Sequence, residues 1–302
     1  MQPSQLDELR ALIVKHVVQS GAPLAAMPNV LLGYEADPTP PCVHVAEPLF
    51  SVIAQGTKQI EIGDRTFVYG PGQGMSVSIE LPMNTFVLDG RRDAPFLGFA
   101  LLLDAEAIAS LLLEHGSRLV PAPAESSVLV SDVPDLLADS IIRLLRLLDS
   151  PADIPVLGPA MEREILWRLL GSPQGGALRQ LGLADSHAAR IGRALQWLRA
   201  RYAEPVRIET LAEAAGMSET SFHRHFRQIT EMTPVQYQKQ LRLHAARARL
   251  MATAQSVDQI AFSVGYDSPS QFSREYRRQY GRSPGRDGRA LRSAEASQQP
   301  VP

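Results

Sequence analysis

The chain has 302 residues, of which 45% are hydrophobic and 21% charged, a composition typical of globular proteins that excludes disorder throughout. Its apolar runs fall far short of the roughly 20 residues that a membrane span needs. Its first residues also lack the basic stretch followed by an apolar block that marks a secretory signal. We therefore expect a cytoplasmic protein with no membrane partner. A single cysteine, Cys42, excludes an internal disulfide and a cysteine-rich metal site.

Charge is unevenly distributed along the chain. Residues 190–292 hold 18 Arg and Lys against 9 Asp and Glu, whereas the whole chain has a formal net charge of −2. The remainder is therefore acidic, which indicates two domains with different partners. The basic region suits a polyanion, most simply nucleic acid, although a solvated basic face would show the same excess.

The N-terminal half changes pattern twice. Residues 1–20 predict one helix, and the prolines between residues 21 and 41 predict an extended, irregular segment. From about 42 to 103, short β-branched runs alternate with glycine turns such as Gly63–Asp64, a pattern typical of an antiparallel sandwich or small barrel. We therefore expect a β-barrel over about 42–103.

Helical periodicity follows over about 104–171, with leucines and isoleucines three and four residues apart. This apolar density suits either an ordinary core or a dimer surface, and we expect residues 1–180 to form one domain that associates as a homodimer. The glycines within 174–186 predict a linker to the basic domain.

The basic region contains a short internal repeat. Residues 211–234 match residues 260–284, with Gly216 aligned to Gly265 and Pro234 to Pro284. In each copy a short helix ends at a glycine, and a second helix begins behind a hydroxyl residue, Ser218 in the first copy. This order is that of a helix-turn-helix.

Three further S/T-x-x-Q sequences predict helix starts with capping boxes, at Thr233, Ser256 and Ser268. On each second helix an i,i+4 aromatic pair faces the core, which leaves the opposite face to polar residues. Arginine can bind guanine and glutamine can bind adenine, whereas later arginines suit phosphate. A generic bundle with a basic face is the alternative, but repeat, caps and face all agree. The candidate DNA-binding residues are Thr220, Ser221, His223, Arg224, Arg227, Ser270, Gln271, Arg274, Arg277 and Arg278.

Three sequence features of residues 190–292 are distinctive: LAEAAGMS, an F-x-R-x-F core and IAFSVGYDSPSQFSREYRRQYGRSP. Through them this region resembles the DNA-binding domain of the AraC/XylS family of bacterial transcription regulators. The resemblance implies a domain over 186–292 with two helix-turn-helix units joined by a long helix, reading successive major grooves, followed by a disordered tail over 293–302. It also implies that the residues in contact with bases are Thr220, Ser221, His223, Arg224, Ser270, Gln271 and Arg274.

The N-terminal half is similar to the cupin-like barrel of one branch of that family, through QG-x-K, GDR-x-F-x-YGPG and ELPM. The resemblance implies a two-domain α+β protein with an antiparallel barrel that senses a small molecule and an all-α DNA-binding domain. The expected partners are double-stranded DNA, an effector of undefined identity and, as a further option, RNA polymerase.

An enzyme is the alternative from another class: a catalytic or ligand-binding barrel with an incidental basic domain. A metal-dependent barrel needs several clustered ligands, whereas the strand region holds one histidine, His44. His223 and His225 point to different faces of a helix. We therefore expect no catalysis, metal or cofactor. Cys42 is either a redox or electrophile sensor or, as we prefer, a small buried residue at a strand start.

Overall fold

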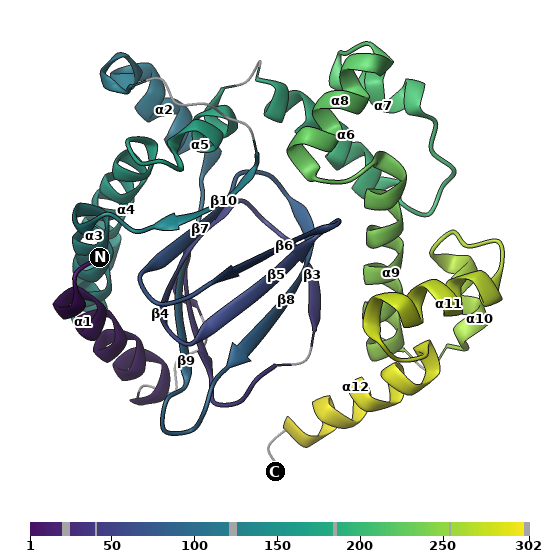
Figure 1. The fold of residues 1–302 in the computed structure, drawn as a ribbon, viewed down its shortest axis with the longest axis horizontal. Coiled ribbons are helices and arrows are strands. Elements are labelled where there is room, and N and C mark those ends of the chain that lie inside the picture. Colours follow the sequence, from purple (N-terminus) through teal and green to yellow (C-terminus); the bar gives the residue numbers. More distant parts are fainter. Residues whose placement is uncertain (20–24, 40, 121–125, 184–185, 254, 299–302) are drawn as a thin grey trace. The chain divides into compact units, whose positions relative to one another are not determined.

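The computed structural model describes residues 1–19, 25–39, 41–120, 126–183, 186–253 and 255–298 (Figure 1). The chain divides into two compact units. The first comprises Met1–Gly192 with Arg224–Met232, and the second comprises Arg193–His223 with Thr233–Pro302. These units are defined by which residues contact one another, and their bounds differ from the expected domain limits. The limits of 1–180 and 186–292 stay a prediction.

The first unit contains two antiparallel sheets. One has the strand order β1-β2-β9-β4-β7-β10 and the other the order β3-β8-β5-β6. Its hairpins follow the predicted turns, including β5–β6 across Gly63–Asp64. The strands are β1 (Ala25–Met27), β2 (Val30–Glu35), β3 (Cys42–Ala46), β4 (Leu49–Gln55), β5 (Thr57–Ile62), β6 (Arg65–Tyr69), β7 (Gln73–Val77), β8 (Leu81–Asp89), β9 (Phe96–Leu102) and β10 (Val128–Asp132).

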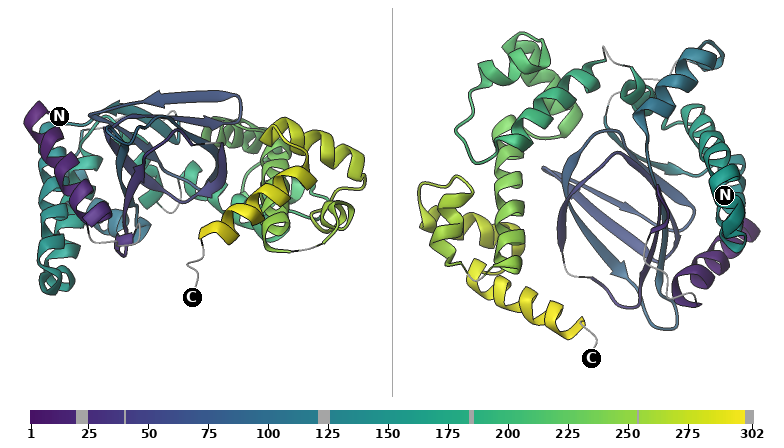
Figure 2. Two further views of the ribbon diagram at one scale, coloured as in Figure 1. Left: turned by 90° about the horizontal axis from the view of Figure 1, so that it is seen from below. Right: turned by 180° about the vertical axis from the view of Figure 1, so that it is seen from behind.

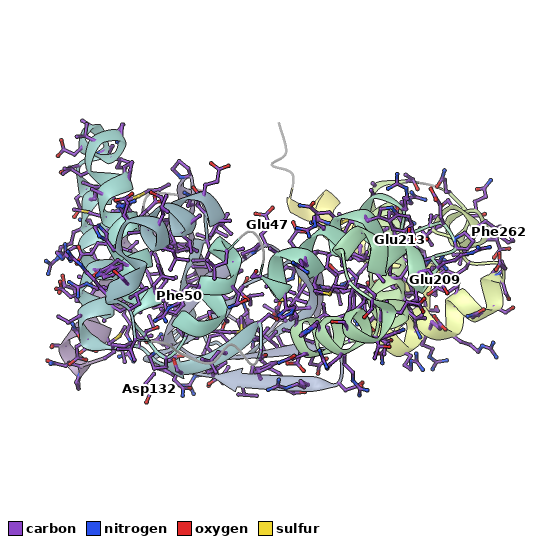
Figure 3. All side chains as sticks on the ribbon, turned by 90° about the horizontal axis from the view of Figure 1, so that it is seen from above. Glu47, Phe50, Asp132, Glu209, Glu213 and Phe262 are labelled. Carbon is purple, nitrogen blue, oxygen red and sulfur yellow. The ribbon has the colours of Figure 1, made fainter. Side chains whose placement is uncertain are left out.

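Helices cover the outer face of the larger sheet (Figures 1 and 2). Because side chains alternate along a strand, Phe50 and Val52 of β4 pack against the helices, whereas Ser51 and Ile53 face the interior of the barrel. Figure 3 labels the buried Phe50 and the exposed Asp132 in this unit. The helices are α1 (Pro3–Val14) with a π-helical end (Lys15–Gln19), α2 (Ala105–His115), α3 (Asp135–Arg146), α4 (Ile154–Leu170) and α5 (Gly175–Gly182), with 3₁₀ turns at Gly116–Arg118, Leu147–Asp149 and Pro151–Asp153.

The helical leucines settle one of the alternatives that the sequence left open. Leu137, Ile141 and Leu145 of α3 lie in one core with α1, α4, β4 and β9 and are at most 2% exposed. Leu136, by contrast, is 65% exposed. The apolar density of α3 is therefore intramolecular packing and gives no argument for a dimer.

Two expectations about the extent of the strands are wrong. Strands β1 and β2 lie inside the segment expected to be irregular, and β10 lies beyond the expected end of the barrel. Pro28 sits in the turn between β1 and β2, so proline here bounds strands rather than excluding them. Pro23 and Pro40 lie outside the described residues.

The expected linker is mostly helix α5, which packs against α2 and α4. Its glycines allow close packing. A Cβ at Gly175 would lie 2.1 Å from the Leu170 carbonyl oxygen, and one at Gly182 would lie 2.7 Å from Ile108. These glycines serve close approach of helices rather than flexibility. Residues 184–185 of the predicted linker lie outside the described residues.

The basic region is helical in all its described elements. Each copy of the repeat supplies a helix-turn-helix, and α9 joins the copies. Helix α12 includes residues 293–298, which the sequence assigned to a disordered tail, and residues 299–302 lie outside the described residues. The helices are α6 (His187–Ala200), α7 (Ile208–Ala215), α8 (Glu219–Thr230), α9 (Pro234–Ala252), α10 (Val257–Ser263), α11 (Pro269–Tyr280) and α12 (Pro284–Gln298).

Candidate nucleic-acid interface and ligand cavity

The turn of the first copy forms as the sequence predicts. Gly216 ends α7 in the left-handed region with φ +62°, which glycine adopts without steric cost. The Ser218 hydroxyl then accepts a hydrogen bond from the Ser221 amide at 3.4 Å. At the start of α7, Arg207 makes no side-chain cap bond, so this helix begins without the usual hydroxyl.

The predicted capping boxes form at Thr233 and Ser256, where each hydroxyl and the following glutamine bond reciprocally to backbone amides. The third is one-sided. Ser268 accepts from the Gln271 amide at 3.4 Å, but the Gln271 side chain donates to Glu275 at 3.4 Å instead of reaching back to the cap. Gln271 therefore lies along the exposed face of α11, where a base contact would require it.

The predicted DNA-binding residues lie on the exposed faces of α8 and α11, whereas Phe222, Phe226, Phe272 and Tyr276 are fully buried. Ser221 is the one member that is only partly exposed. Both helices therefore present a continuous polar face behind an aromatic anchor, which is the arrangement of a recognition helix. The exposed members are Thr220, His223, Arg224, Arg227, Ser270, Gln271, Arg274, Arg277 and Arg278.

The two histidines of α8 separate as expected. His223 is exposed, whereas His225 stacks on His187 with ring centroids 3.8 Å apart. Burial and the neighbouring His187 lower the pKa of His225, so the stacked ring favours its neutral form. No group of three or more His, Cys, Asp or Glu in the described part of the chain could hold a metal ion.

Polar groups between the helices hold the second unit in place. The Arg242 guanidinium of α9 donates to the backbone carbonyls of Tyr202 at 2.8 Å and Gly265 at 2.7 Å. Asp287 of α12, 4% exposed, accepts from the Tyr276 hydroxyl of α11 at 2.7 Å and from Arg247 of α9 at 3.1 Å. These bonds tie α11 to α9 and α12, so its exposed face is presented on a rigid support.

The barrel contains a cavity of about 420 Å³ that is open at its rim, and its size falls within the roughly 300–1,000 Å³ of small-molecule sites. Strands of both sheets line it, and most of its wall is apolar. Ser51 and Tyr69 form a buried polar pair in this wall, with their oxygens 3.0 Å apart. Burial raises the pKa of Tyr69 to about 12, so the phenol stays neutral. Apolar lining residues include Leu32, Ile60, Met75, Met83 and Phe99.

One cation reaches this cavity, Lys58 of β5, a residue that we did not single out from the sequence. In T-K-Q-I-E-I the alternation places Lys58 on the same inward face as Ile60 and Ile62, and this pattern could have revealed it. Burial lowers the pKa of the Lys58 ammonium, while Cys42 and Glu35 act weakly in the opposite direction.

Cys42 is not the buried residue that we preferred from the sequence. It is exposed at the start of β3 and lines the cavity together with His44 of the same strand. A strand start at the rim of a barrel leaves the first side chain open to solvent, which the strand pattern alone does not reveal.

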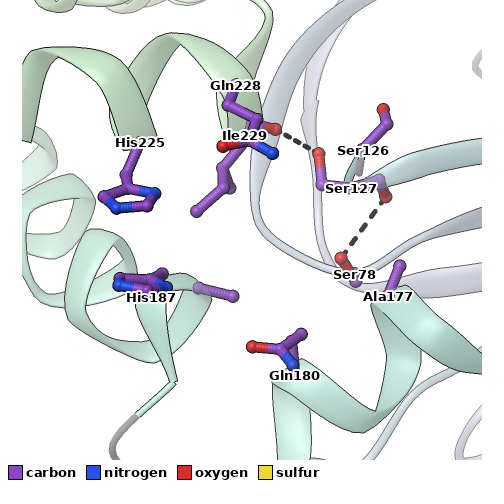
Figure 4. Close-up of a pocket in the computed structure, with 10 residues that line it drawn as sticks. Ser78, Ser126, Ser127, Ala177, Gln180, His187, His225, Gln228 and Ile229 are labelled. Carbon is purple, nitrogen blue, oxygen red and sulfur yellow. Dashed lines mark hydrogen bonds between the residues drawn. The ribbon is translucent and has the colours of Figure 1, made fainter. Parts of the chain in front are cut away.

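Two other hollows suit an effector less well. A groove of about 620 Å³ lies beside α2 and α4, but its charged groups Glu162 and Arg163 are already paired with Asn29 and Glu114. A pocket of about 200 Å³ in the first unit lies beside the stacked histidines (Figure 4). It is smaller than typical ligand pockets.

A barrel with an internal cavity and two helix-turn-helix units define a DNA-binding regulator with a separate N-terminal domain. A model of the AraC-type transcriptional regulator N-terminus matches residues 26–177, and a helix-turn-helix domain model matches residues 211–290. The first match covers half of the chain, and the chain therefore belongs to the AraC-type family of transcriptional regulators. In the described residues no helix is long and apolar enough to cross a membrane.

Curated relatives match part of the chain. The chain is 36% identical over 131 residues to the HTH-type transcriptional activator RhaS of Escherichia fergusonii, covering 42% of this chain and 46% of that protein. It is 36% identical over 100 residues to RhaS of an Enterobacter species, covering 33% and 36% of the two proteins. The matched part is thus less than half the length of either relative.

Solved structures of ToxT from Vibrio cholerae share the fold over most of both chains. Apo ToxT gives a TM-score of 0.55 at 8% identity, covering 88% of this chain and 98% of that chain. ToxT bound to (E)-4-(8-methylnaphthalen-1-yl)but-3-enoic acid gives 0.54 at 9% identity, covering 86% and 99%. At this identity the likeness shows the fold alone.

Proposed function

We propose that this AraC-type regulator binds specific DNA through α8 and α11 and changes its DNA occupancy when a small molecule enters the barrel. The carrying observation is the pair of helix-turn-helix units on one connecting helix, each with a buried aromatic anchor and an exposed polar face.

The base contacts are assigned to residues in the N-terminal halves of α8 and α11, since this part of a recognition helix reaches base edges. They are Thr220, Ser221, His223, Arg224, Ser270, Gln271 and Arg274. Arg227, Arg277 and Arg278 lie further along the helices and suit phosphate contacts, which add affinity without sequence preference.

The effector site is assigned to the barrel cavity, because it is mostly apolar and of ligand size. The bound ligand in a ToxT structure supports the idea that regulators of this fold take a small molecule. The RhaS relatives are activators, and an activator role with RNA polymerase as a partner is part of the proposal. Its place of action is the cytoplasm, where a bacterial regulator meets its operator.

A homodimer is also part of the proposal, since two chains on adjacent sites raise the effective concentration of recognition helices. The exposed apolar residues Leu113 of α2 and Val156 of α4, 90% and 74% exposed, are the candidates for its surface. Sedimentation of the full chain at micromolar concentration tests this. A dimer that becomes monomeric in a Leu113→Glu, Val156→Glu variant supports it, and a wild-type monomer contradicts it.

Selection from a pool of random DNA duplexes tests the main proposal. The full chain is expected to enrich one sequence motif, and its affinity for that motif is expected to exceed its affinity for random DNA by at least about 10³-fold. Enrichment of no motif, with equal affinity for all duplexes, would favour the alternative of a small-molecule-binding or enzymatic barrel with an incidental basic domain.

A further inference from the structure

Among the described residues that line the barrel cavity, Lys58 is the one lysine or arginine. Lys58 lies between Tyr69 of β6 and Val87 of β8 in the sheet register, and both neighbours line the cavity with it. Within the described residues no hydrogen bond or ion pair reaches its ammonium. A cation without a close partner in such a site costs free energy that an anion in the cavity would recover.

The surroundings of Lys58 supply no full counter-charge. Glu35 of β2 interacts with it only at longer range and is itself exposed, at the cavity rim. The other titratable groups that line the cavity are Cys42 and His44 of β3 and Tyr69 of β6, while β4, β7, β8 and β9 line it with uncharged residues. Tyr69 is held by its contact with Ser51.

Apolar side chains make up most of the remaining wall, so its occupant combines one anionic group with a hydrophobic body. We propose that the barrel binds a small amphipathic carboxylate, with the carboxylate against the Lys58 ammonium and the apolar body among Leu32, Met75 and Phe99. This inference rests on the proposed function and names the chemical class of its effector.

The proposed contact carries a proton signature. Burial lowers the pKa of Lys58 in the free protein, and a carboxylate at its ammonium raises that pKa again. Carboxylate binding above the free-protein pKa therefore takes up a proton, and affinity falls as pH rises through that range. Uncharged ligands of the same shape bind without this uptake.

Isothermal titration calorimetry of the full chain tests the inference with decanoate and 4-phenylbutanoate, each compared with the primary alcohol of the same skeleton. We expect the acids to bind at least about 10-fold more tightly than the alcohols. In titrations at a series of rising pH values, we expect the acids to take up protons once Lys58 of the free protein is deprotonated, seen as a heat that depends on the ionisation enthalpy of the buffer. Acids that bind no better than alcohols, or do not bind, would overturn the proposal.

Variants locate the contact. Lys58→Met is expected to weaken acid binding by about 10- to 100-fold, to abolish proton uptake and to leave alcohol binding unchanged. Lys58→Arg keeps the charge and is expected to retain the preference for acids. Lys15→Met is the matched control, because it removes an equal charge from a lysine that pairs with Asp149 outside the cavity. Equal losses in Lys58→Met and Lys15→Met would contradict the assignment.

A DNA-binding assay on the same samples separates this inference from the proposed function. Sequence-specific DNA binding without any preference for acids would refute the carboxylate class and leave the regulator intact. Acid binding at Lys58 in a protein that binds no specific DNA would refute the proposed function instead.

Discussion

The two units of this chain place their charged groups differently. In the second unit charged groups join helices: the half-buried Arg242 donates to backbone carbonyls, and the buried Asp287 accepts from the Tyr276 hydroxyl. The first unit packs an apolar core between helices and sheet, keeps ion pairs such as Arg143–Glu164 at its surface and leaves a hollow inside the barrel. A small helical unit thus gains a rigid recognition surface from buried bonds, whereas the barrel stays free to accept a ligand.

The largest expected effect comes from breaking the buried network. Replacing Asp287 with Ala removes the acceptor of the Tyr276 hydroxyl and one partner of Arg247, and we expect a loss of about 3 kcal/mol in the unfolding free energy of the second unit. Urea unfolding followed by Trp197 fluorescence, in a Trp167→Phe background, measures it. The exposed Asp267 serves as control, and Asp267→Ala is expected to cost less than about 0.5 kcal/mol. Removing one partner of a buried pair costs several kcal/mol, so a loss of less than about 1 kcal/mol for Asp287→Ala would contradict this role.

The exposed face of α11 sharpens the comparison on the functional side. We expect Arg274→Ala to cost about 1 to 3 kcal/mol on the selected DNA motif and to relax preference at particular base pairs. Arg278→Ala, one turn further along, is expected to weaken binding evenly on specific and random DNA and to reduce the salt dependence. Competition gel shifts measure both variants. If the two lose affinity equally on specific and random DNA, the assigned reading face is wrong.

The surface pair of the first unit predicts a dependence on pH. Hydrogen bonds from Arg143, at 2.7 Å, and from Arg168 lower the pKa of Glu164 to about 2. Because the folded pKa is depressed, this stabilisation is present above the unfolded value near 4.5 and is lost as pH falls toward 2. We expect a contribution of about 1 to 2 kcal/mol after solvent screening.

The free energy of unfolding of the first unit is measured at several values between about pH 6 and pH 3, a range that spans the usual carboxyl pKa. Trp167 fluorescence in a Trp197→Phe background follows the unfolding. Glu164→Gln should flatten the decline. Glu162→Gln, two residues away along α4 and bonded to Asn29 rather than to an arginine, is the control and should not change the slope.

The smallest expected effect concerns helix starts within the second unit. Helix α10 begins with a full box at Ser256, whereas α7 begins at Arg207 with no side-chain bond. Ser256→Ala is expected to cost about 1 kcal/mol, and Arg207→Ser to add about 0.5 to 1 kcal/mol. Differential scanning calorimetry of both variants checks the opposite signs. If Ser256→Ala does not destabilise the protein and Arg207→Ser does not stabilise it, side-chain capping does not stabilise these two helix starts.

The sequence predicted the helical unit well, because its signals are local. Gly216 and the hydroxyls of Thr233 and Ser256 each fix a turn or helix start through bonds within four residues. The buried network was not predictable, since Asp287 meets Arg247 only after the helices pack.

The barrel was predicted only in outline. Strands β1 and β2 were missed, because flanking prolines read as irregular chain and β2 finds its partner β9 far along the sequence. Cys42 was assigned to the core although it is exposed. The strand alternation could have shown that the Lys58 side chain points inward. The cavity into which it points forms only when the two sheets pack face to face, which the sequence does not reveal.

Footprinting on the selected DNA motif tests the central claim most directly, with wild type, Arg224→Ala and Arg274→Ala compared at saturating protein. Two recognition helices on one chain predict two protected major-groove segments about one helical turn, or 10 base pairs, apart. Arg224→Ala should lose protection in one segment and Arg274→Ala in the other. A single protected segment, or uniform loss of both segments in each variant, would contradict reading of DNA by α8 and α11 together.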